Sequence, residues 1–438
     1  MAEFIIHGGK KLHGSVRLGG AKNASFKLMI AALLAPGETH LLNIPRIDDV
    51  EITRSIIQHL GGSVRAAGER LFCLDPRGLK TSEIPLSFGT RSRASSMFIP
   101  PLLARFQKAT VPLPGGDKIG ERPLNRLFEG LKLMGARVVQ HKDQVTVSAK
   151  KLHGARISFE KNTHTGTETL ILAAVLAAGE TIIDNAAEEP EVDDLIAMLV
   201  GMGARIKRTL KRRITIEGVR RLDPTIYSVM PDRNEAVSYA IAAVATGGDI
   251  IVENASHKHL GAFLDKLSEA GGGFETGSFG IRFFSKGQLR GVKVTTQPYP
   301  GFMTDWQPLW AVLMTQAQGQ SIIHESVHNN RFQYIDDLVR MGADMTLYTP
   351  KVADPKTFYN FNLTDDHRQY KHGAKILGPT PLKGIDIAIH DLRAGATLVL
   401  AALIAQGSSR LRGIDQIDRG YENLDGRLID LGANIKRV

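Results

Sequence analysis

The chain has 438 residues, 43% of them hydrophobic, and we expect two or more packed cores because single cores rarely exceed about 250–300 residues. Lys and Arg outnumber Asp and Glu by 55 to 45, a formal net charge of +10. The basic residues are scattered and aromatic residues make up only 6%, which argues against a single-strand nucleic-acid platform. We therefore expect a cleft that attracts small anions such as phosphates and carboxylates.

The sequence also argues against a membrane span and a disulfide framework. Its apolar runs stay short of the roughly 18–20 residues that a span needs, and its first residues lack the pattern of a signal peptide. The one cysteine, Cys73, excludes an intrachain disulfide and a zinc cluster, and its strand-like surroundings predict a buried structural thiol. These features predict a cytoplasmic protein without a membrane partner.

Self-similarity along the chain predicts six repeats of about 70 residues. Each repeat has an apolar helix that ends in small residues and Gly, a strand that begins near Thr or Ser, and a second helix that closes on a glycine. Two of the first helices read Met29-Ile-Ala-Ala-Leu-Leu-Ala-Pro-Gly-Glu-Thr and Ile171-Leu-Ala-Ala-Val-Leu-Ala-Ala-Gly-Glu-Thr. The closing glycines are Gly61, Gly135, Gly203, Gly271, Gly342 and Gly432.

The first helices of the repeats are so rich in Ala and Leu that we expect them to be buried nearly all round, with sheets outside them. This layering predicts an α/β fold of the inside-out barrel type. Six repeats divide into two lobes of three, residues 22–229 as one lobe and residues 1–21 with 230–438 as the other. We expect ligands to bind in a cleft between such lobes.

Three of the first helices begin with a cation: Lys22, Arg93 and Arg393. A cation at a helix N-terminus opposes the macrodipole by roughly 0.3–1 kcal/mol. A bound anion would reverse that sign, because the N–H groups, the dipole and the side chain would all face negative charge. Chance explains any one of these cations, but three at equivalent places predict an anion site.

Two other first helices begin near an acid, Asp232 and Asp305. A carboxylate at a helix start is a favourable N-cap, so capping is the structural interpretation of both. If the predicted cations converge on Asp305, it becomes a candidate general base in a positive cleft. For Asp232 we expect capping.

Residues 112–123 read Pro-Leu-Pro-Gly-Gly-Asp-Lys-Ile-Gly-Glu-Arg-Pro and predict an exposed loop, since Gly and Pro disfavour a helix or a central strand. The loop carries a carboxylate, Asp117, and a guanidinium, Arg122. These groups suit a lid over an anionic substrate. A solvated surface loop is the alternative interpretation.

The last repeat interval is longer because of a polar segment, residues 348–373. His367 and His372 lie five positions apart in it. A metal-binding pair is conceivable, but without a cysteine partner we expect a surface insertion and no metal site.

These stretches resemble the enolpyruvyl transferases nearly end to end. Ala21-Lys-Asn-Ala and Arg93-Ala-Ser favour the branch that acts on a sugar nucleotide over the branch that acts on shikimate 3-phosphate. The blocks that carry the resemblance are Leu12-His-Gly-Ser-Val, Gly19-Gly-Ala-Lys-Asn-Ala, Arg93-Ala-Ser, Leu102-Leu-Ala-Arg-Phe, Leu113-Pro-Gly-Gly, Ile119-Gly-Glu-Arg-Pro, Asn185-Ala-Ala-Glu-Glu-Pro-Glu, Pro231-Asp-Arg, Phe302-Met-Thr-Asp, Asn330-Arg-Phe, Asp391-Leu-Arg-Ala and Ile417-Asp-Arg-Gly-Tyr-Glu.

The resemblance implies the enolpyruvyl transferase fold, with three repeats in each of two lobes that close over the substrates. It implies an enzyme that moves the enolpyruvyl group of phosphoenolpyruvate to the 3-hydroxyl of UDP-N-acetylglucosamine and releases phosphate. That reaction is the first committed step of peptidoglycan synthesis, and so serves cell-wall biogenesis, cell shape, the cell cycle and cell division. No metal and no organic cofactor are implied, and we expect a monomer without a nucleic-acid partner.

For the donor, the resemblance places Lys22 on phosphoenolpyruvate and Asn23 near the sugar and phosphate. It assigns the donor's phosphate and carboxylate to Arg122, Arg393 and Arg419. The planar guanidinium fork suits both groups because it can donate two parallel hydrogen bonds.

For proton transfer, the resemblance assigns the hydroxyl proton to Asp305 and protonation of the methylene carbon to Asp117. Arg93 would lie near the nucleotide end. The other substrate-binding positions that the resemblance implies are Arg122, Pro123, Leu124, Asn125, Arg126, Asn162, Thr163, His164, Thr165 and Val327.

Asp117 stands at the loop position where most relatives carry cysteine. A carboxylic acid can protonate carbon there if closure of the loop raises its pKa by desolvation. Because a carboxylate is not alkylated as a thiolate is, we predict resistance to the epoxide antibiotic fosfomycin.

Some residues depart from the family pattern. Relatives show Asp and His where this chain has Asn125 and Leu127. Where relatives show Lys-Val-Ser-Val, this chain has Asn162-Thr-His-Thr, and Asn329 stands where they have an acid. All but the last concern the nucleotide end. These departures leave open a paralogue that acts on another sugar nucleotide or nucleoside. A non-catalytic or RNA-binding relative with a similar repeat fold is an alternative from a different class.

Overall fold

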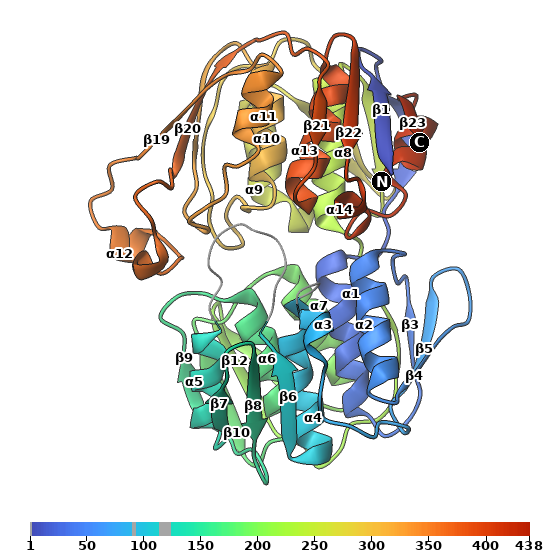
Figure 1. Cartoon of the computed structure of the whole chain (residues 1–438), viewed down its shortest axis with the longest axis vertical. Coiled ribbons are helices and arrows are strands. Elements are labelled where there is room, and N and C mark those ends of the chain that lie inside the picture. The colour runs from blue at the N-terminus through green and yellow to red at the C-terminus, as the bar shows by residue number, and fades with distance from the viewer. Residues whose placement is uncertain (1, 90–92, 114–123) are drawn as a thin grey trace. The chain divides into compact units, whose positions relative to one another are not determined.

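The computed structural model of the protein describes residues 2–89, 93–113 and 124–438. The predicted loop residues Asp117, Arg122 and Pro123 therefore lie outside the described residues, as does the side chain of Arg93. The described chain forms two compact units (Figure 1). We call the first the Lys22 unit (Gly19 to Leu113 and Leu124 to Met230) and the second the Asp305 unit (up to Leu18, and Pro231–Val438).

In the Lys22 unit, the described residues form three sheets, ordered β13-β3-β5-β4, β6-β8-β7 and β11-β12-β10-β9. The strands are β3 (Thr39–Leu42), β4 (Ser63–Ala66), β5 (Leu71–Asp75), β6 (Lys108–Pro112), β7 (Arg137–Gln140), β8 (Gln144–Ser148), β9 (Arg156–Ser158), β10 (Glu180–Asp184), β11 (Arg205–Leu210), β12 (Arg213–Glu217) and β13 (Ile226–Ser228). The helices are α1 (Lys22–Ala31), η1 (Ala32–Leu34), α2 (Asp48–His59), α3 (Leu86–Gly89), η2 (Arg93–Phe98), α4 (Ile99–Phe106), α5 (Asn125–Leu133), α6 (His164–Ala174) and α7 (Pro190–Gly201).

In the Asp305 unit, the described residues also form three sheets, ordered β21-β22-β1-β23, β15-β16-β14-β2 and β17-β18-β20-β19. The strands are β1 (Glu3–His7), β2 (His13–Arg17), β14 (Asp249–Glu253), β15 (Gly273–Gly277), β16 (Gly280–Phe284), β17 (Lys293–Thr295), β18 (Gly319–His324), β19 (Asp344–Tyr348), β20 (Gly373–Gly378), β21 (Asp386–Ala388), β22 (Ser408–Arg412) and β23 (Asn434–Arg437). The helices are α8 (Arg233–Ala245), η3 (His257–His259), α9 (Gly261–Glu269), α10 (Gln307–Thr315), α11 (Ile335–Arg340), α12 (Pro355–Phe358), η4 (Leu363–Asp365), α13 (Leu392–Ile404), α14 (Asp415–Asp418) and α15 (Leu424–Asp430).

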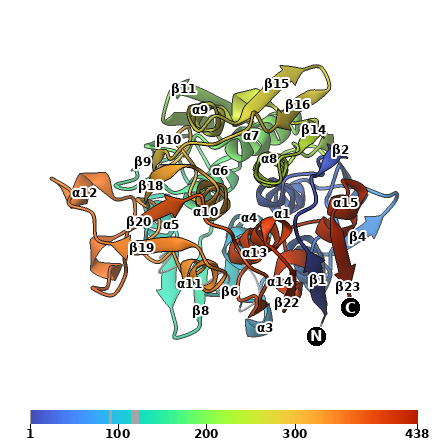
Figure 2. The same ribbon diagram turned by 90° about the horizontal axis from the view of Figure 1, so that it is seen from above.

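The Ala- and Leu-rich first helices of the repeats, such as α6 in the Lys22 unit and α10 in the Asp305 unit, lie inside and the sheets outside, as the sequence pattern predicts. In the Asp305 unit, α8, α10 and α13 pack against one another, and Figure 2 shows strands of the three sheets around them. Every residue of α10 is buried, as are nearly all of α8 and α13. Helices that are apolar on all sides have no face to offer water, so they fill the core while sheets with one polar face cover them.

The six closing glycines predicted from the repeats share one backbone conformation. Gly61, Gly135, Gly203, Gly271, Gly342 and Gly432 have φ values between 89° and 104°. Each follows the second helix of its repeat. A residue in the left-handed conformation ends the helix there, so that backbone N–H groups after the helix can donate to its last carbonyls. A side chain at these positions would be strained, which explains the regular spacing of Gly in the sequence.

The N-terminal residues add strands to two sheets of the Asp305 unit. β1 pairs antiparallel with both β22 and β23, and β2 pairs parallel with β14. In the Lys22 unit, β13 is the last strand before the chain passes to the Asp305 unit, and it pairs parallel with β3. Each unit has its own hydrophobic core. Cys73, on β5, is buried as the sequence predicts.

Among the described helices, none combines the length and the apolar character that crossing a bilayer requires.

Candidate active site

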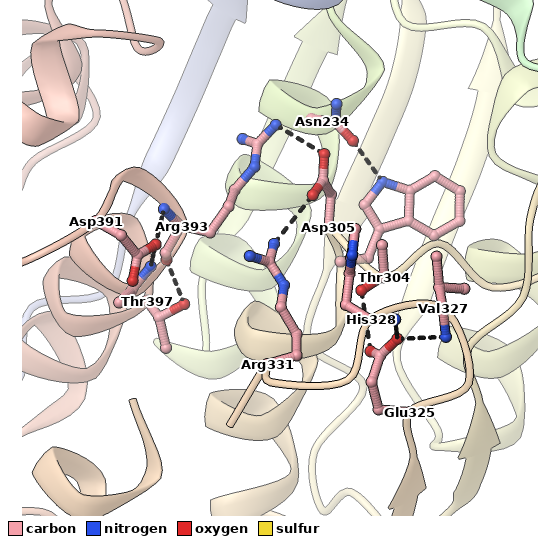
Figure 3. Close-up of polar contacts among 12 residues, drawn as sticks. Asn234, Thr304, Asp305, Glu325, Val327, His328, Arg331, Asp391, Arg393 and Thr397 are labelled. Atoms are coloured by element: carbon pink, nitrogen blue, oxygen red, sulfur yellow. Dashed lines mark hydrogen bonds and ion pairs between the residues drawn. The ribbon is translucent and has the colours of Figure 1, made fainter. Parts of the chain in front are cut away.

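Asp305 lies between two guanidinium groups in the Asp305 unit (Figure 3). Arg331 Nη2 donates to Asp305 Oδ1 at 3.0 Å, and Arg393 Nη2 donates to Asp305 Oδ2 at 3.3 Å. The side chains of Arg331 and Arg393 are 3% and 7% exposed, whereas that of Asp305 is 23% exposed. The carboxylate is therefore the member of this group that solvent or a substrate can reach.

The capping interpretation of Asp305 is wrong. Helix α10 begins at Gln307, and its N-cap is Trp306. By contrast, Asp232 caps α8 as expected, since its Oδ1 accepts hydrogen bonds from Asn234 N at 2.7 Å and Glu235 N at 3.1 Å. The carboxylate of Asp305 is thus available for its contacts with the arginines.

The start of α13 positions Arg393. Asp391 caps this helix by accepting hydrogen bonds from the backbone N–H groups of Arg393 and Ala394 at 2.9 and 3.0 Å. Arg393 Nη1 donates to Tyr421 Oη at 3.2 Å, and the Tyr421 hydroxyl also contacts Ser238 Oγ at 2.7 Å. Burial disfavours the charged guanidinium, but attraction to Asp305 more than offsets this, so the pKa of Arg393 lies above its ordinary value. Arg393 is therefore fixed and charged.

Arg331 reaches Asp305 from the loop 325–331, which follows β18. The buried carboxylate of Glu325 fixes the first turn of this loop: its Oε1 accepts from the N–H groups of Val327 and His328 at 2.8 and 3.0 Å. Thr304 Oγ1 donates to its Oε2 at 3.0 Å. Burial raises the pKa of Glu325, while the two N–H donors oppose that rise. The same glutamate thus connects the loop to the residue that precedes Asp305.

Arg331 is the site residue that sequence reasoning missed. It lies in the Asn330-Arg-Phe block, but no helix start or repeat position drew attention to it. The available signal was an arginine in a short polar stretch directly after a strand, where a loop side chain can reach the end of a neighbouring helix.

In the Lys22 unit, Lys22 is the first residue of α1, and its Nζ lies 2.7 Å from Asp49 Oδ2. The two side chains are 12% and 7% exposed. The sequence predicted that a bound anion would balance the charge of Lys22 at this helix start. Asp49, in the first turn of α2, supplies a negative charge there. Asn23 is the second residue of α1 and is half-buried.

A second cluster of charges joins α1 to α6. Lys27 Nζ lies 2.5 Å from Glu168 Oε2 and 3.1 Å from His164 Nε2, which is itself 3.2 Å from Glu168 Oε1. Burial would lower the pKa of His164, but the charge of Glu168 outweighs it and the net shift is upward. The predicted acceptor-binding residue His164 is thus tied to buried ionic contacts.

The neighbours of His164 support the start of α6. Thr163 caps this helix by accepting from Gly166 N at 3.2 Å, and Asn162 Nδ2 donates to Asn185 O at 3.2 Å. The carbonyl of Thr165 accepts from Thr169 Oγ1 at 2.8 Å. These contacts fix the backbone of the segment.

The start of α5 holds three further predicted positions. Leu124 and Arg126 are half-buried and Asn125 is exposed. Leu127, the departure noted beside them, is 2% exposed and belongs to the core of the Lys22 unit. Of the two departures here, Asn125 alone faces solvent.

Arg419 is the C-cap of α14 in the Asp305 unit. Its Nη1 contacts Gln416 Oε1 at 3.4 Å, and it lies two residues before Tyr421, the partner of Arg393. The Asp305 unit thus brings together Asp305, Arg331, Arg393 and the 419–421 segment, whereas Lys22 belongs to the Lys22 unit.

Among the described residues, one group of side chains has ligand atoms close enough for a metal: Glu38, His40 and Cys73. Glu38 already contacts His40 Nε2 at 2.9 Å and Arg65 Nη2 at 3.5 Å. The His367 and His372 pair considered from the sequence does not share a site, because His372 is buried against Asp366 and His367 packs on Tyr370. We assign no metal to these groups.

Comparison with known proteins decides the family. A family model described as EPSP synthase (3-phosphoshikimate 1-carboxyvinyltransferase) matches residues 6–428. The chain belongs to this enolpyruvyl transferase family. The UDP-N-acetylglucosamine 1-carboxyvinyltransferase of Acidobacterium capsulatum is 40% identical over 442 residues, which cover 100% of this chain and 96% of that protein. The enzyme named UDP-N-acetylglucosamine 1-carboxyvinyltransferase 1 in Carboxydothermus hydrogenoformans is 41% identical over 438 residues, which cover 100% and 99%.

Solved structures of this family show the same fold. The enolpyruvyl transferase NikO from Streptomyces tendae matches with a TM-score of 0.86 at 23% identity, covering 100% of this chain and 99% of that one. EPSP synthase from Acinetobacter baumannii matches with a TM-score of 0.73 at 19% identity over the whole of both chains. The predicted enolpyruvyl transferase fold is confirmed.

Proposed function

We propose that this chain transfers the enolpyruvyl group of phosphoenolpyruvate to the 3-hydroxyl of UDP-N-acetylglucosamine and releases phosphate, as a UDP-N-acetylglucosamine 1-carboxyvinyltransferase. The observation that carries the proposal is the identity of about 40% with enzymes of that name along the whole chain. The reaction is the first committed step of peptidoglycan synthesis. We further expect a cytoplasmic monomer.

The reaction proceeds by addition and elimination. The sugar hydroxyl oxygen bonds to C2 of phosphoenolpyruvate, its proton leaves to a base, and the methylene carbon C3 gains a proton. This gives a tetrahedral intermediate. The methyl group then loses a proton and the C2–O bond to phosphate breaks, which forms the enolpyruvyl ether and inorganic phosphate.

We assign the base to Asp305 because its carboxylate is partly exposed between two buried arginines. A donor anion that attracts Arg393 would share the guanidinium and leave Asp305 Oδ2 open to the hydroxyl proton. The anionic groups of the donor are bound by Lys22, Arg122, Arg393 and Arg419, since charge-assisted bonds to phosphate and carboxylate are the strongest these side chains form. Asp117 then donates the proton to C3.

The acceptor is bound by Asn23, Arg93, the 123–126 segment, the 162–165 segment and Val327. Within the described part of this set, the backbone is fixed by the contacts of Thr163 and by the Glu325 turn. A fixed backbone suits recognition of a sugar nucleotide because little conformational entropy is lost when it binds.

Phosphate release with different acceptors tests the proposal. We expect turnover with phosphoenolpyruvate and UDP-N-acetylglucosamine, and none when either is omitted. Turnover with another sugar nucleotide or nucleoside, but none with UDP-N-acetylglucosamine, would assign the chain to the paralogous function. A salt-sensitive affinity for oligonucleotides without phosphate release would support an RNA-binding role.

Fosfomycin tests the assignment of Asp117. We expect the wild-type enzyme to keep its activity after incubation with the epoxide, and Asp117→Cys to lose activity with time as the thiolate is alkylated. Asp143→Cys, an exposed position outside the loop, is the control and should stay resistant. Rapid covalent inactivation of the wild type would contradict the assignment.

A further inference from the structure

Residues 349–372, between β19 and β20, are more than a solvated insertion. Tyr359, Phe361 and His372 are 5%, 6% and 3% exposed. The ring of Tyr359 stacks on that of Phe361 with centroids 4.8 Å apart, and the ring of Phe358 lies 4.7 Å from that of His324 at the end of β18. This segment therefore has an aromatic cluster of its own that fixes it to the sheet.

The segment also forms hydrogen bonds with the loop 325–331. Asn360 N donates to Ser326 O at 2.7 Å, and Glu325 N donates to His372 O at 2.8 Å. Asn329 Nδ2 donates to Asp365 O at 2.5 Å. Asn329 is 1% exposed, so the donor of this last bond is shielded from water, and its removal takes a partner from the carbonyl of Asp365.

The same loop carries two residues of the site. Val327 is an acceptor contact in the proposed function, and Arg331 donates to Asp305. Glu325 holds the loop from the side of Thr304, as Figure 3 shows, while the segment 349–372 holds it through residues 325, 326 and 329. A shift of the loop would therefore move both the acceptor contact and the partner of Asp305.

We propose that the segment 349–372 positions the loop 325–331 for the acceptor, with Asn329 as the positioning residue that connects the two. The inference rests on the proposed function. It places the effect on binding of the sugar nucleotide, because the predicted donor contacts Lys22 and Arg393 lie outside this loop. Binding of phosphoenolpyruvate should consequently be unaffected.

The exchange Asn329→Asp tests the proposal because it keeps the size of the side chain and replaces the donor to Asp365 O with an acceptor. We expect the KM for UDP-N-acetylglucosamine to rise about 2- to 10-fold, the range that one lost hydrogen bond gives. The KM for phosphoenolpyruvate should change less than twofold. Asn329→Ala, which removes the donor without burying a charge, should act in the same direction if the aspartate variant fails to fold.

Thr357→Val is the matched control. Its hydroxyl donates to Oδ2 of Asp354, the N-cap of α12, at 2.8 Å, in the same segment but apart from the loop contacts. We expect wild-type KM values for both substrates. If this variant raises the acceptor KM as much as Asn329→Ala does, the effect belongs to the whole segment and the role of Asn329 is wrong.

Hydrogen–deuterium exchange of the ligand-free protein separates this proposal from the proposed function. In both Asn329 variants, peptides that contain the amides of Val327 and His328 should exchange about 2- to 10-fold faster, since the loop opens more often. Unchanged exchange, or equal rises in both KM values, would overturn the positioning role. Faster exchange in a protein that does not turn over UDP-N-acetylglucosamine would keep the positioning role and reject the acceptor.

Discussion

The two units arrange their charged side chains in different ways. In the Asp305 unit, two arginines share one carboxylate at 3.0 and 3.3 Å. In the Lys22 unit, each lysine of α1 meets an acid: Lys22 lies 2.7 Å from Asp49, and Lys27 lies 2.5 Å from Glu168. Both arrangements are largely buried, yet they differ in how charge is balanced.

The group around Asp305 has an excess of positive charge and so suits an anionic ligand. The pair of Lys27 and Glu168 is neutral overall and needs no ligand to balance its charge. Arg331 and Arg393 share one carboxylate, which leaves net positive charge, and a phosphate or carboxylate of the donor can balance that charge at Arg393. Lys27 and Glu168, at 5% and 0% exposure, balance each other inside the protein. Lys22 and Asp49 keep slightly more exposure, so the ammonium can turn to a ligand at lower cost.

The largest expected effect is on Asp305. Asp305→Asn keeps the shape but removes the base, and we expect kcat to fall about 10²- to 10⁴-fold, the range for loss of a general base. Phosphate release measures it. Asp337→Asn, a half-buried acid paired with the exposed Arg340 on α11, is the control and should keep full activity. A loss of less than tenfold in Asp305→Asn would remove the distinction between the two arrangements.

The next effect compares the two lysines of α1. Lys27→Met leaves the fully buried Glu168 without its cation, and we expect about 3–5 kcal/mol less stability in urea unfolding. Lys22→Met should lose less stability because Asp49 is nearer to solvent, but its KM for phosphoenolpyruvate should rise. If Lys22→Met is the more destabilised variant and keeps wild-type kinetics, Lys22 is structural as well.

The smallest effect concerns Asp194, an acid that accepts hydrogen bonds from neutral donors. Asp194 on α7 accepts from Tyr227 Oη at 2.8 Å and Met230 N at 3.3 Å, and burial outweighs these bonds and raises its pKa to about 6. Between about pH 4 and pH 6 the unfolded chain ionises this group before the folded protein does, so its contribution to stability is lost as the pH rises.

Asp194→Asn should remove that dependence. We expect the stability of the variant relative to wild type to rise by about 1–3 kcal/mol when the pH is raised from 4 to 7. Urea unfolding at both pH values measures this change. Asp193→Asn, at the adjacent exposed acid that pairs with Arg208, is the control and should show no such gain. An equal change in the two variants would show that burial of Asp194 is not the cause.

The sequence predicted the family and the fold, and both are confirmed. It could do so because the signals are local. The second helix of each repeat ends at its own glycine, for example Gly61 or Gly432, and each continuous apolar helix indicates a buried element. The enzyme assignment is supported by the names of relatives along the whole chain. The lobe boundaries and the individual site roles remain predictions.

What the sequence alone determined were the repeats, their layering, the family and the candidate residues Lys22, Asp305 and Arg393. Only the tertiary structure decided which charges meet: Asp49 on Lys22, Arg331 on Asp305, and the donor of Asn329 on a carbonyl of the 349–372 segment. A helix end or an apolar stripe is specified within a few residues of chain. An ion pair between residues far apart in sequence depends on how strands and loops return to one another, which local pattern does not encode.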